Sequence, residues 1–354
     1  MAKSLMKGCE AIGEAAVRAG CRYFFGYPIT PQTEIPEYLA RRLPEVGGIF
    51  LQAESEVAAI NMLLGAGGAG VRVFTSSSSP GISLMSEGLS YIAASEVPVV
   101  LINIVRSGPG LGGILPAQSD YRHCVKGTAH GDFKLIVLAP ASVQEAVDLV
   151  RLAFDLSDKY RNPALIIGDG MIGQMMEPVE FPDFVDPETL PDKPWACTGA
   201  KGRPPNIINS LYLDAAKCND LNFKLAAKYR EVEANEKRWD TYNCEAPHEI
   251  LIVAYGTMAR ICRTSIDELK DGGLSVGLFR PISLYPYPYE ALAAEITRPG
   301  VKRVLVVEMS MGQMVDDVRL AALGRVPIDF YGKAGGVVPA PEEVLAETRR
   351  LAAL

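Results

Sequence analysis

Closely spaced cysteines are missing from this sequence, although it contains seven cysteines. None belongs to a C-x-x-C pair, and no histidine has a pair of cysteines nearby. Iron–sulfur clusters and structural zinc sites need such spacings, so neither is expected in this chain. Scattered thiols are typical of reduced, mostly buried cysteines in a reducing compartment. They stand at Cys9, Cys21, Cys124, Cys197, Cys218, Cys244 and Cys262.

Histidine and excess positive charge are also scarce. The three histidines, His123, His130 and His248, form no pair with the i, i+4 spacing of a helical metal site, so no metal site is predicted. His123 and His130 lie in one irregular segment and are interpreted as structural or surface residues. The net charge of −7 argues against a nucleic-acid-binding surface.

Long apolar runs are absent as well. No run reaches the roughly 18 residues of a membrane span, and the N-terminus lacks the apolar segment of a signal peptide. We therefore expect a soluble, cytoplasmic protein with no membrane partner. The hydrophobic content of 48% is that of a globular protein, and 354 residues suit two domains of about 100 to 200 residues each.

Helical and strand patterns alternate along the chain, which indicates an α/β protein. The predicted strands are continuous Val, Ile, Leu and Phe runs, typical of parallel strands covered on both faces. We predict a doubly wound parallel sheet domain over 1–176, a linker or arm over 177–248, and a second α/β domain over 249–354. The arm begins with seven prolines between Pro178 and Pro205 and ends in a charged helical segment over 215–239.

Four loops of small or turn-forming residues follow predicted strands of the first domain. The carboxyl ends of parallel strands meet at one edge of a sheet, so these loops are predicted to form one site. They are Gly26-Tyr27-Pro28-Ile29-Thr30-Pro31, Gln52-Ala53-Glu54-Ser55-Glu56, Thr75-Ser76-Ser77-Ser78-Ser79-Pro80-Gly81 and Arg106-Ser107-Gly108-Pro109-Gly110.

Together these motifs resemble the alpha subunit of the 2-oxoacid:ferredoxin oxidoreductases, which use thiamine diphosphate to oxidise 2-oxoacids to acyl-CoA. The runs FFGYPITPQTEIPEY, LQAESEVAAIN and SSSSPGISL are most similar to the branched-chain (2-oxoisovalerate) members. The resemblance covers nearly the whole chain. It implies a pyrimidine-type thiamine diphosphate domain followed by a transketolase C-terminal-like domain.

The resemblance also implies roles for individual residues. A glutamate opening a helix, often with a glycine nine residues on, acts as the proton relay to the cofactor; Glu56 and Gly65 fit this spacing, whereas Glu54 does not. Glu54 is interpreted as a charge that favours the helix N-terminus. Arg106 is expected to bind the substrate carboxylate, since a guanidinium can do so with two hydrogen bonds. Thr30, between two prolines, is expected at the substrate or the cofactor ring, with Tyr27, Pro28 and Ile29 beside the cofactor.

Two glycine patterns are similar to known binding motifs but lack the context that those motifs need. Gly65 to Gly70 matches G-x-G-x-x-G but follows a helix and precedes a strand, the reverse of the dinucleotide-binding order. Gly168-Asp169-Gly170 is similar to the motif that binds Mg2+ and diphosphate, but the next asparagine is Asn206, too far away. The resemblance implies that a beta subunit holds the diphosphate and Mg2+. It also implies 4Fe-4S clusters on gamma and ferredoxin-like delta subunits, coenzyme A as co-substrate, and ferredoxin as the electron acceptor.

Several alternatives remain open at this point. The substrate is 2-oxoisovalerate or, within the same family, 2-oxoglutarate, pyruvate or an aryl oxoacid. A rival of another class is a non-catalytic scaffold subunit, which separation of Glu56 from Arg106 would favour. The subunit count, the direction of the reaction, the coenzyme A site and the role of the arm are not determined by the sequence.

Overall fold

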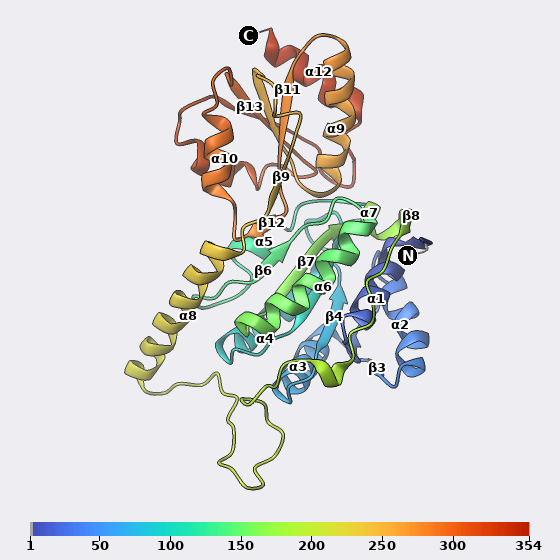
Figure 1. The fold of residues 1–354 in the computed structure, drawn as a ribbon, viewed down its shortest axis with the longest axis vertical. Coiled ribbons are helices and arrows are strands. Elements are labelled where there is room, and N and C mark those ends of the chain that lie inside the picture. Colours follow the sequence, from blue (N-terminus) through green and yellow to red (C-terminus); the bar gives the residue numbers. More distant parts are fainter. Residues whose placement is uncertain (1–2, 354) are drawn as a thin grey trace.

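The computed structural model describes residues 3–353, which form two α/β units joined by an arm (Figure 1). The first unit has a seven-stranded sheet in the order β12-β6-β7-β5-β4-β2-β3. All neighbouring pairs are parallel except β12 with β6. The strands are β2 (Tyr23–Gly26), β3 (Ile49–Gln52), β4 (Val73–Ser77), β5 (Val100–Val105), β6 (Ile136–Leu138), β7 (Ala164–Asp169) and β12 (Ser283–Tyr285).

Helices cover both faces of this sheet because the chain reverses its direction across the sheet at β3. Right-handed crossovers then place α3 and α4 on the opposite face, and a second reversal between β6 and β7 returns α6 to the face of α1 and α2. Helix α1 packs against α2 and α6, whereas α3 packs against α4. Strands β4, β5 and β7 between them are entirely buried. The helices are α1 (Gly8–Arg18), α2 (Glu34–Glu45), α3 (Glu56–Gly68), α4 (Pro80–Ala94), α5 (Tyr121–Lys126), α6 (Val143–Tyr160) and α7 (Gly170–Gln174).

The second unit has a five-stranded sheet in the order β14-β13-β10-β11-β9, in which only β9 is antiparallel to its neighbour. Its strands are β9 (Trp239–Tyr242), β10 (Ile250–Val253), β11 (Val276–Pro281), β13 (Arg303–Glu308) and β14 (Ile328–Gly332). Its helices are α9 (Gly256–Asp271), α10 (Tyr289–Ile296), α11 (Val315–Ala322) and α12 (Pro341–Ala352).

The arm leaves the first unit after a small antiparallel pair, β1 (Ser4–Lys7) with β8 (Met176–Val179). Apart from a short 3-10 helix, η1 (Pro187–Thr189), it is irregular until α8 (Ala215–Asn235), which runs back along the first unit (Figure 1). Three large apolar side chains of the arm, Ile207, Leu211 and Leu213, are between 67% and 91% exposed. Such side chains are available to a partner.

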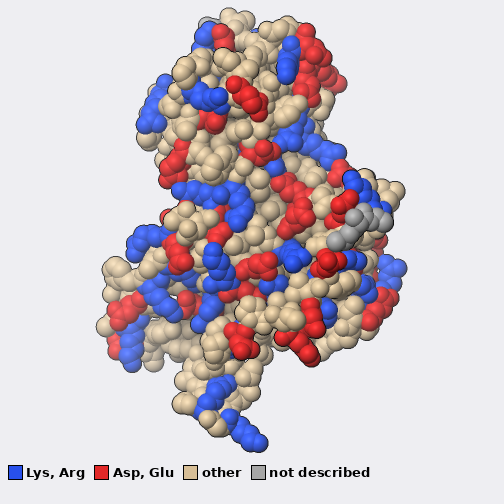
Figure 2. All heavy atoms as spheres, viewed as in Figure 1, with Lys and Arg blue, Asp and Glu red and all other residues tan. Residues whose placement is uncertain are grey.

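Four short strands lie where the sequence pattern gives no strand: β1, β8, β9 and β12. β9 falls inside the segment predicted as an arm, and β12, from the later part of the chain, extends the first sheet. Each is an edge strand of three or four residues whose pairing depends on tertiary contacts. Among the described residues, no helix is both long enough and apolar enough to cross a membrane. Acidic and basic side chains are interspersed on the face shown in Figure 2.

Gln118, in the long loop after β5, joins the two units. Its backbone N–H donates to the Met309 carbonyl (2.8 Å), and its side-chain oxygen accepts from the Met309 N–H (3.0 Å). The side-chain NH2 group donates to the Tyr255 carbonyl (2.9 Å). Gln118 is 3% exposed, so these bonds are shielded from water. The loop that begins at Arg106 is therefore anchored on the second unit.

Gln118→Ala should lower the stability of the full chain. The substitution leaves a buried N–H of Met309 and a buried carbonyl of Tyr255 without their side-chain partners, at a cost of about 1 to 3 kcal/mol. Urea unfolding measures the change. Gln144→Ala is the matched control, because the Gln144 side chain bonds Asp148 and Glu180 at the surface. Equal midpoints for the two variants would contradict the anchoring role of Gln118.

Candidate functional site

Four loops gather at the carboxyl edge of the first sheet. They follow β2, β3, β4 and β5, which are neighbours in the parallel part of the sheet. Loops at this edge form the ligand crevices of open α/β sheets, because strand order reverses there and leaves room between the helices. The turn after β4, residues 77–81, lies between the loops that carry Glu56 and Arg106.

Glu56 is the first residue of α3 and is only 4% exposed. The helix begins here because the Ser55 side chain accepts a hydrogen bond from the Ala58 N–H (3.3 Å). The Glu56 carboxylate accepts a hydrogen bond from the Ser77 hydroxyl at 3.2 Å. Glu54, in contrast, is exposed. The structure thus separates the two glutamates: one carboxylate is buried at the site and the other faces solvent.

Gly81 allows the Glu56 carboxylate to pack against the start of α4. A Cβ at this position would lie 2.0 Å from the Ser77 Oγ and 2.3 Å from the Glu56 Oε1. No side chain can occupy that space without moving one of these groups. Glycine is therefore required here by close approach, and the cradle that it leaves contains the carboxylate.

Ser79 lies between these residues in a strained conformation, with a φ of 27°. Its N–H donates to the Asn103 side chain (3.1 Å), and its hydroxyl bonds both the N–H (3.1 Å) and the carbonyl (3.2 Å) of Arg106. These hydrogen bonds offset the strain and fix the distance between the turn and the end of β5.

Arg106 is 7% exposed and its guanidinium is held by main-chain carbonyls. One terminal nitrogen donates to Thr30 (3.1 Å) and the other to Leu111 (3.0 Å). Its Nε is buried and has no hydrogen-bond partner among the described residues. Arg106 therefore links the loop after β2 to its own loop by hydrogen bonds, and its Nε–H remains available to a ligand.

The loop after β2 is partly exposed. Tyr27 is 37% exposed, Thr30 is also exposed, and Pro28 and Ile29 are half-buried. The main chain is nevertheless fixed, because the fully buried Gln32 donates to the Tyr27 carbonyl (3.1 Å) and accepts from the Ser76 hydroxyl (2.6 Å).

A cavity of about 690 Å3 lies beside the Arg106 loop. It opens between the two units: Ser107 and Pro109 line it from the first unit, and Met309 and Gln313 line it from the second. His123 also lines this cavity and lies 3.4 Å from the Ser86 hydroxyl. Of the two histidines in the irregular segment, His130 is exposed.

Glu56 and Arg106 meet at one turn, since Glu56 bonds Ser77 and Arg106 bonds Ser79. No sequence motif identified Gln32, Asn103 or the individual serines as site residues. The sequence feature that could have identified Asn103 is a polar residue inside an otherwise apolar strand. In the structure the Asn103 side chain donates to Asp120 (2.9 Å). Buried polar groups need partners, so such residues indicate a structured site.

Asp169 of the Gly168-Asp169-Gly170 motif does not fit a Mg2+ or diphosphate site. Its carboxylate accepts hydrogen bonds from the N–H groups of Met171 (2.8 Å) and Ile172 (3.3 Å), so it caps α7. The residue is 3% exposed, and burial raises the pKa of its carboxyl group above the ordinary value. The motif therefore has a structural explanation in this chain.

Comparison with known proteins gives two family matches. The family described as "Pyruvate flavodoxin/ferredoxin oxidoreductase, thiamine diP-bdg" matches residues 14–242. The family described as "Pyruvate:ferredoxin oxidoreductase core domain II" matches residues 248–344. A curated relative, the ketoisovalerate oxidoreductase subunit VorB of Methanothermobacter marburgensis, is 44% identical over 352 residues, 99% of each chain.

Two solved structures are similar in fold. A 2-oxoglutarate:ferredoxin oxidoreductase from Magnetococcus marinus, with 2-oxoglutarate, coenzyme A and succinyl-CoA bound, superposes with a TM-score of 0.86 at 27% identity. The match covers 98% of this chain and 65% of that chain. A split-gene transketolase, an inactive beta4 tetramer, gives a TM-score of 0.58 at 13% identity over 99% of each chain, which shows the fold alone. The predicted α/β fold class, a thiamine-diphosphate-binding domain followed by a transketolase-like domain, is confirmed.

Asp169→Asn should keep the helix cap and gain stability relative to wild type as the pH rises. Because the folded-state pKa of Asp169 is raised, its favourable contribution is present below the unfolded-state value of about 4 and fades above it. Asparagine has no such titration. Unfolding midpoints at about pH 4 and about pH 7 measure the difference, and a constant difference would contradict this account. Asp169→Ala, without the acceptor, should be less stable than Asp169→Asn by about 0.5 to 2 kcal/mol.

Proposed function

Because this chain belongs to the pyruvate flavodoxin/ferredoxin oxidoreductase family, as its sequence motifs predicted, we propose that it is the alpha-type subunit of a 2-oxoisovalerate:ferredoxin oxidoreductase. The proposed reaction is oxidative decarboxylation of the 2-oxoacid to acyl-CoA, with electrons passed to ferredoxin. The observation that carries the choice of substrate is the 44% identity to a ketoisovalerate oxidoreductase subunit over 99% of both chains.

Two alternatives are weighed against this proposal. A 2-oxoglutarate synthase subunit, KorA of Methanocaldococcus jannaschii, is 34% identical, and a pyruvate synthase subunit, PorA of Methanothermobacter thermautotrophicus, is 29% identical. We therefore rank 2-oxoglutarate as the second candidate substrate, ahead of pyruvate and aryl oxoacids. A scaffold without catalytic residues is the second candidate role. The shared turn between Glu56 and Arg106 supports the enzyme, because a scaffold has no need to bury a carboxylate and a guanidinium at one sheet edge.

The residues fit the pyrimidine half of a thiamine diphosphate site. When bound, this cofactor supplies a nucleophilic carbon for the keto group and an electron sink after CO2 leaves. Glu56, buried in the cradle left by Gly81, would hold the proton at the aminopyrimidine ring. Tyr27, Pro28, Ile29 and Thr30 would line the ring from the loop after β2, where their side chains are half-buried or exposed.

Arg106 would bind the carboxylate of the 2-oxoacid. Its guanidinium is already oriented by the Thr30 carbonyl, so little freedom remains to be lost on binding. The Thr30 and Leu111 carbonyls occupy two of the five N–H donors of the guanidinium, so a carboxylate could use the remaining donors. If the carboxylate also took the donor that bonds Leu111, the loop over 107–115 would have to move. A guanidinium–carboxylate bond, in which both partners are ionised, is stronger than the guanidinium–carbonyl bond that it would replace. Thr30 would orient the same substrate.

Partner subunits would complete the site. Since the Asp169 carboxylate is used as a helix cap, we assign the diphosphate and Mg2+ to a beta subunit. Along α3, Val57, Asn61 and Gly65 form an exposed stripe beside Glu56, and a Cβ at Gly65 would meet nothing within 4 Å. This stripe suits close approach by that subunit. Gamma and ferredoxin-like delta subunits would carry 4Fe-4S clusters and pass electrons to ferredoxin.

The function is tested on the native complex, purified with its subunits identified. Coenzyme A-dependent reduction of a viologen dye is compared for 2-oxoisovalerate, 2-oxoglutarate, pyruvate and an aryl oxoacid. We expect the highest kcat/KM with 2-oxoisovalerate. A higher kcat/KM with another 2-oxoacid would show that the proposed substrate is wrong. Absence of activity with all four would show that the proposed enzymatic function is wrong.

Glu56→Gln should lower kcat about 100-fold or more, the usual contribution of a positioned acid or base, because an amide cannot exchange the proton. Glu54→Gln is the matched control and should lose only a helix-dipole contribution of about 0.3 to 1 kcal/mol. The measurement that distinguishes the two variants is exchange of the cofactor C2 proton with D2O in the assembled complex. The exchange is followed by NMR after acid quench. If the Glu56→Gln variant exchanges the C2 proton as fast as wild type, Glu56 is not the proton relay.

Arg106→Ala should reduce kcat/KM for the 2-oxoacid about 10- to 100-fold, corresponding to the loss of about 1.5 to 3 kcal/mol from a charge-assisted hydrogen bond. Cofactor content should stay near that of wild type. Arg22→Ala is the control, since Arg22 also donates to two backbone carbonyls, those of Val17 and Cys21, outside the site. An unchanged kcat/KM would make Arg106 a purely structural residue.

A further inference from the structure

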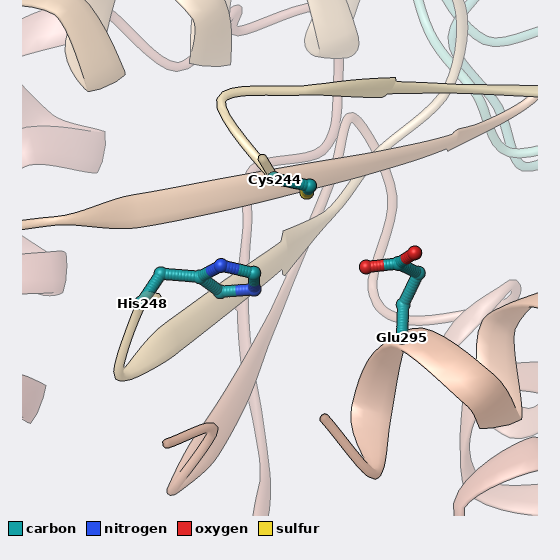
Figure 3. Close-up of side chains that lie close together, drawn as sticks. All are labelled: Cys244, His248 and Glu295. Atoms are coloured by element: carbon teal, nitrogen blue, oxygen red, sulfur yellow. The ribbon is translucent and has the colours of Figure 1, made fainter. Parts of the chain in front are cut away.

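The second unit contains a cluster of three metal-ligating side chains that the proposed function does not use. Cys244 follows β9, His248 precedes β10, and Glu295 projects from α10 (Figure 3). One ligand atom from each residue lies within 4.8 Å of the other two. Cys244 is 2% exposed and His248 is 3% exposed, so solvent hardly reaches their side chains.

His248 points an unused nitrogen into this cluster. Its Nδ1 lies 3.2 Å from the Ala246 carbonyl, which can only accept, so Nδ1 carries a proton. In the neutral ring Nε2 then has a free lone pair. This Nε2 is buried and has no hydrogen-bond partner among the residues the structure describes. A histidine whose other nitrogen donates to a backbone carbonyl is the usual arrangement of a metal ligand.

Gly277 of β11 shows that the sulfur and the nitrogen face one space. A Cβ at this position would lie 2.8 Å from both the Cys244 Sγ and the His248 Nε2. Its backbone has no left-handed φ that would call for glycine. The close approach of the two side chains is therefore what excludes a larger residue here.

Glu295 supplies the negative charge. One carboxylate oxygen, Oε2, forms an ion pair with Arg298 at 2.9 Å. Within residues 3–353, no hydrogen bond to Oε1 is found, and Figure 3 shows the carboxylate directed toward the His248 ring. The carboxylate can thus keep its ion pair and still offer one oxygen to a cation.

We propose that Cys244, His248 and Glu295 form a site for a divalent zinc ion, with water as the fourth ligand. Thiolate, imidazole and carboxylate are the three ligand types that Zn2+ accepts in tetrahedral sites, whereas Mg2+ and Ca2+ require oxygen ligands. Binding replaces the Cys244 thiol proton, which leaves to solvent, and satisfies the orphaned Nε2 of His248. The site is independent of the proposed enzymatic function.

The position of the site separates it from the proposed reaction. Cys244 and His248 lie at the amino ends of the parallel strands, the opposite end from Tyr255 and Met309, which contact Gln118. A bound ion would join the loop between β9 and β10 to α10, two segments without a shared strand. The sequence did not predict this metal site, because Glu295 is remote from the other two ligands and the segment over 244–248 contains only one cysteine and one histidine.

The test uses the full chain, free of any affinity tag, stripped with a chelator and dialysed against Zn2+. Metal analysis should find stoichiometric Zn2+ in wild type, and loading should raise the unfolding temperature. Cys244→Ser and Glu295→Gln should weaken binding by more than the 10- to 100-fold typical of losing an outer-shell partner. The controls are Cys262→Ser, a buried cysteine on α9, and Glu290→Gln, on the same helix as Glu295.

Cobalt substitution keeps the test decisive if a variant does not fold. Co2+ bound by wild type should show a thiolate-to-metal charge-transfer band in the near ultraviolet. Gly277→Ala, which keeps all three ligands but fills the space between two of them, should remove this band. Absence of the band in wild type, or Zn2+ retention by Cys244→Ser equal to that of Cys262→Ser, overturns the proposal.

Discussion

One strained turn, residues 77–81 after β4, holds the site together. Ser79 adopts a positive φ and bonds both backbone groups of Arg106, while Ser77 bonds the Glu56 carboxylate. Gly81 removes the atoms that would otherwise separate them. The loops after three strands are thereby fixed relative to one another by short polar contacts, and the buried strands beneath them provide the rigid base.

Much of this architecture follows from the sequence. The long helices and buried parallel strands have clear apolar patterns, so their order and the α/β class were predicted correctly, as was the family. Glu56 was distinguished from Glu54 by spacing, and the structure buries the former and exposes the latter. The strands β1, β8, β9 and β12 were missed because three or four residues carry no periodicity and their pairing is decided by neighbours distant in sequence.

Polar contacts within the core were harder to predict. Gln32 and Asn103 are fully buried and organise loops, yet each looks unremarkable beside its apolar neighbours in the sequence. The Cys244, His248 and Glu295 cluster depends on the placement of α10 against a loop that precedes it by some distance. Such groups become visible only when the fold specifies which side chains share a buried space.

The proposed role of Arg106 makes its contact with the Leu111 carbonyl relevant to selectivity. One terminal nitrogen of the guanidinium already donates to this neutral acceptor, so a ligand that takes this donor must offer more than another neutral oxygen. The carbonyl oxygen of an aldehyde, ketone or amide accepts a hydrogen bond no stronger than the one from the Leu111 carbonyl that it would replace. A carboxylate adds a full negative charge and a second acceptor oxygen. The closed loop would thus act as a threshold that excludes uncharged carbonyl compounds from a reactive centre, before the shape of the acyl group is considered.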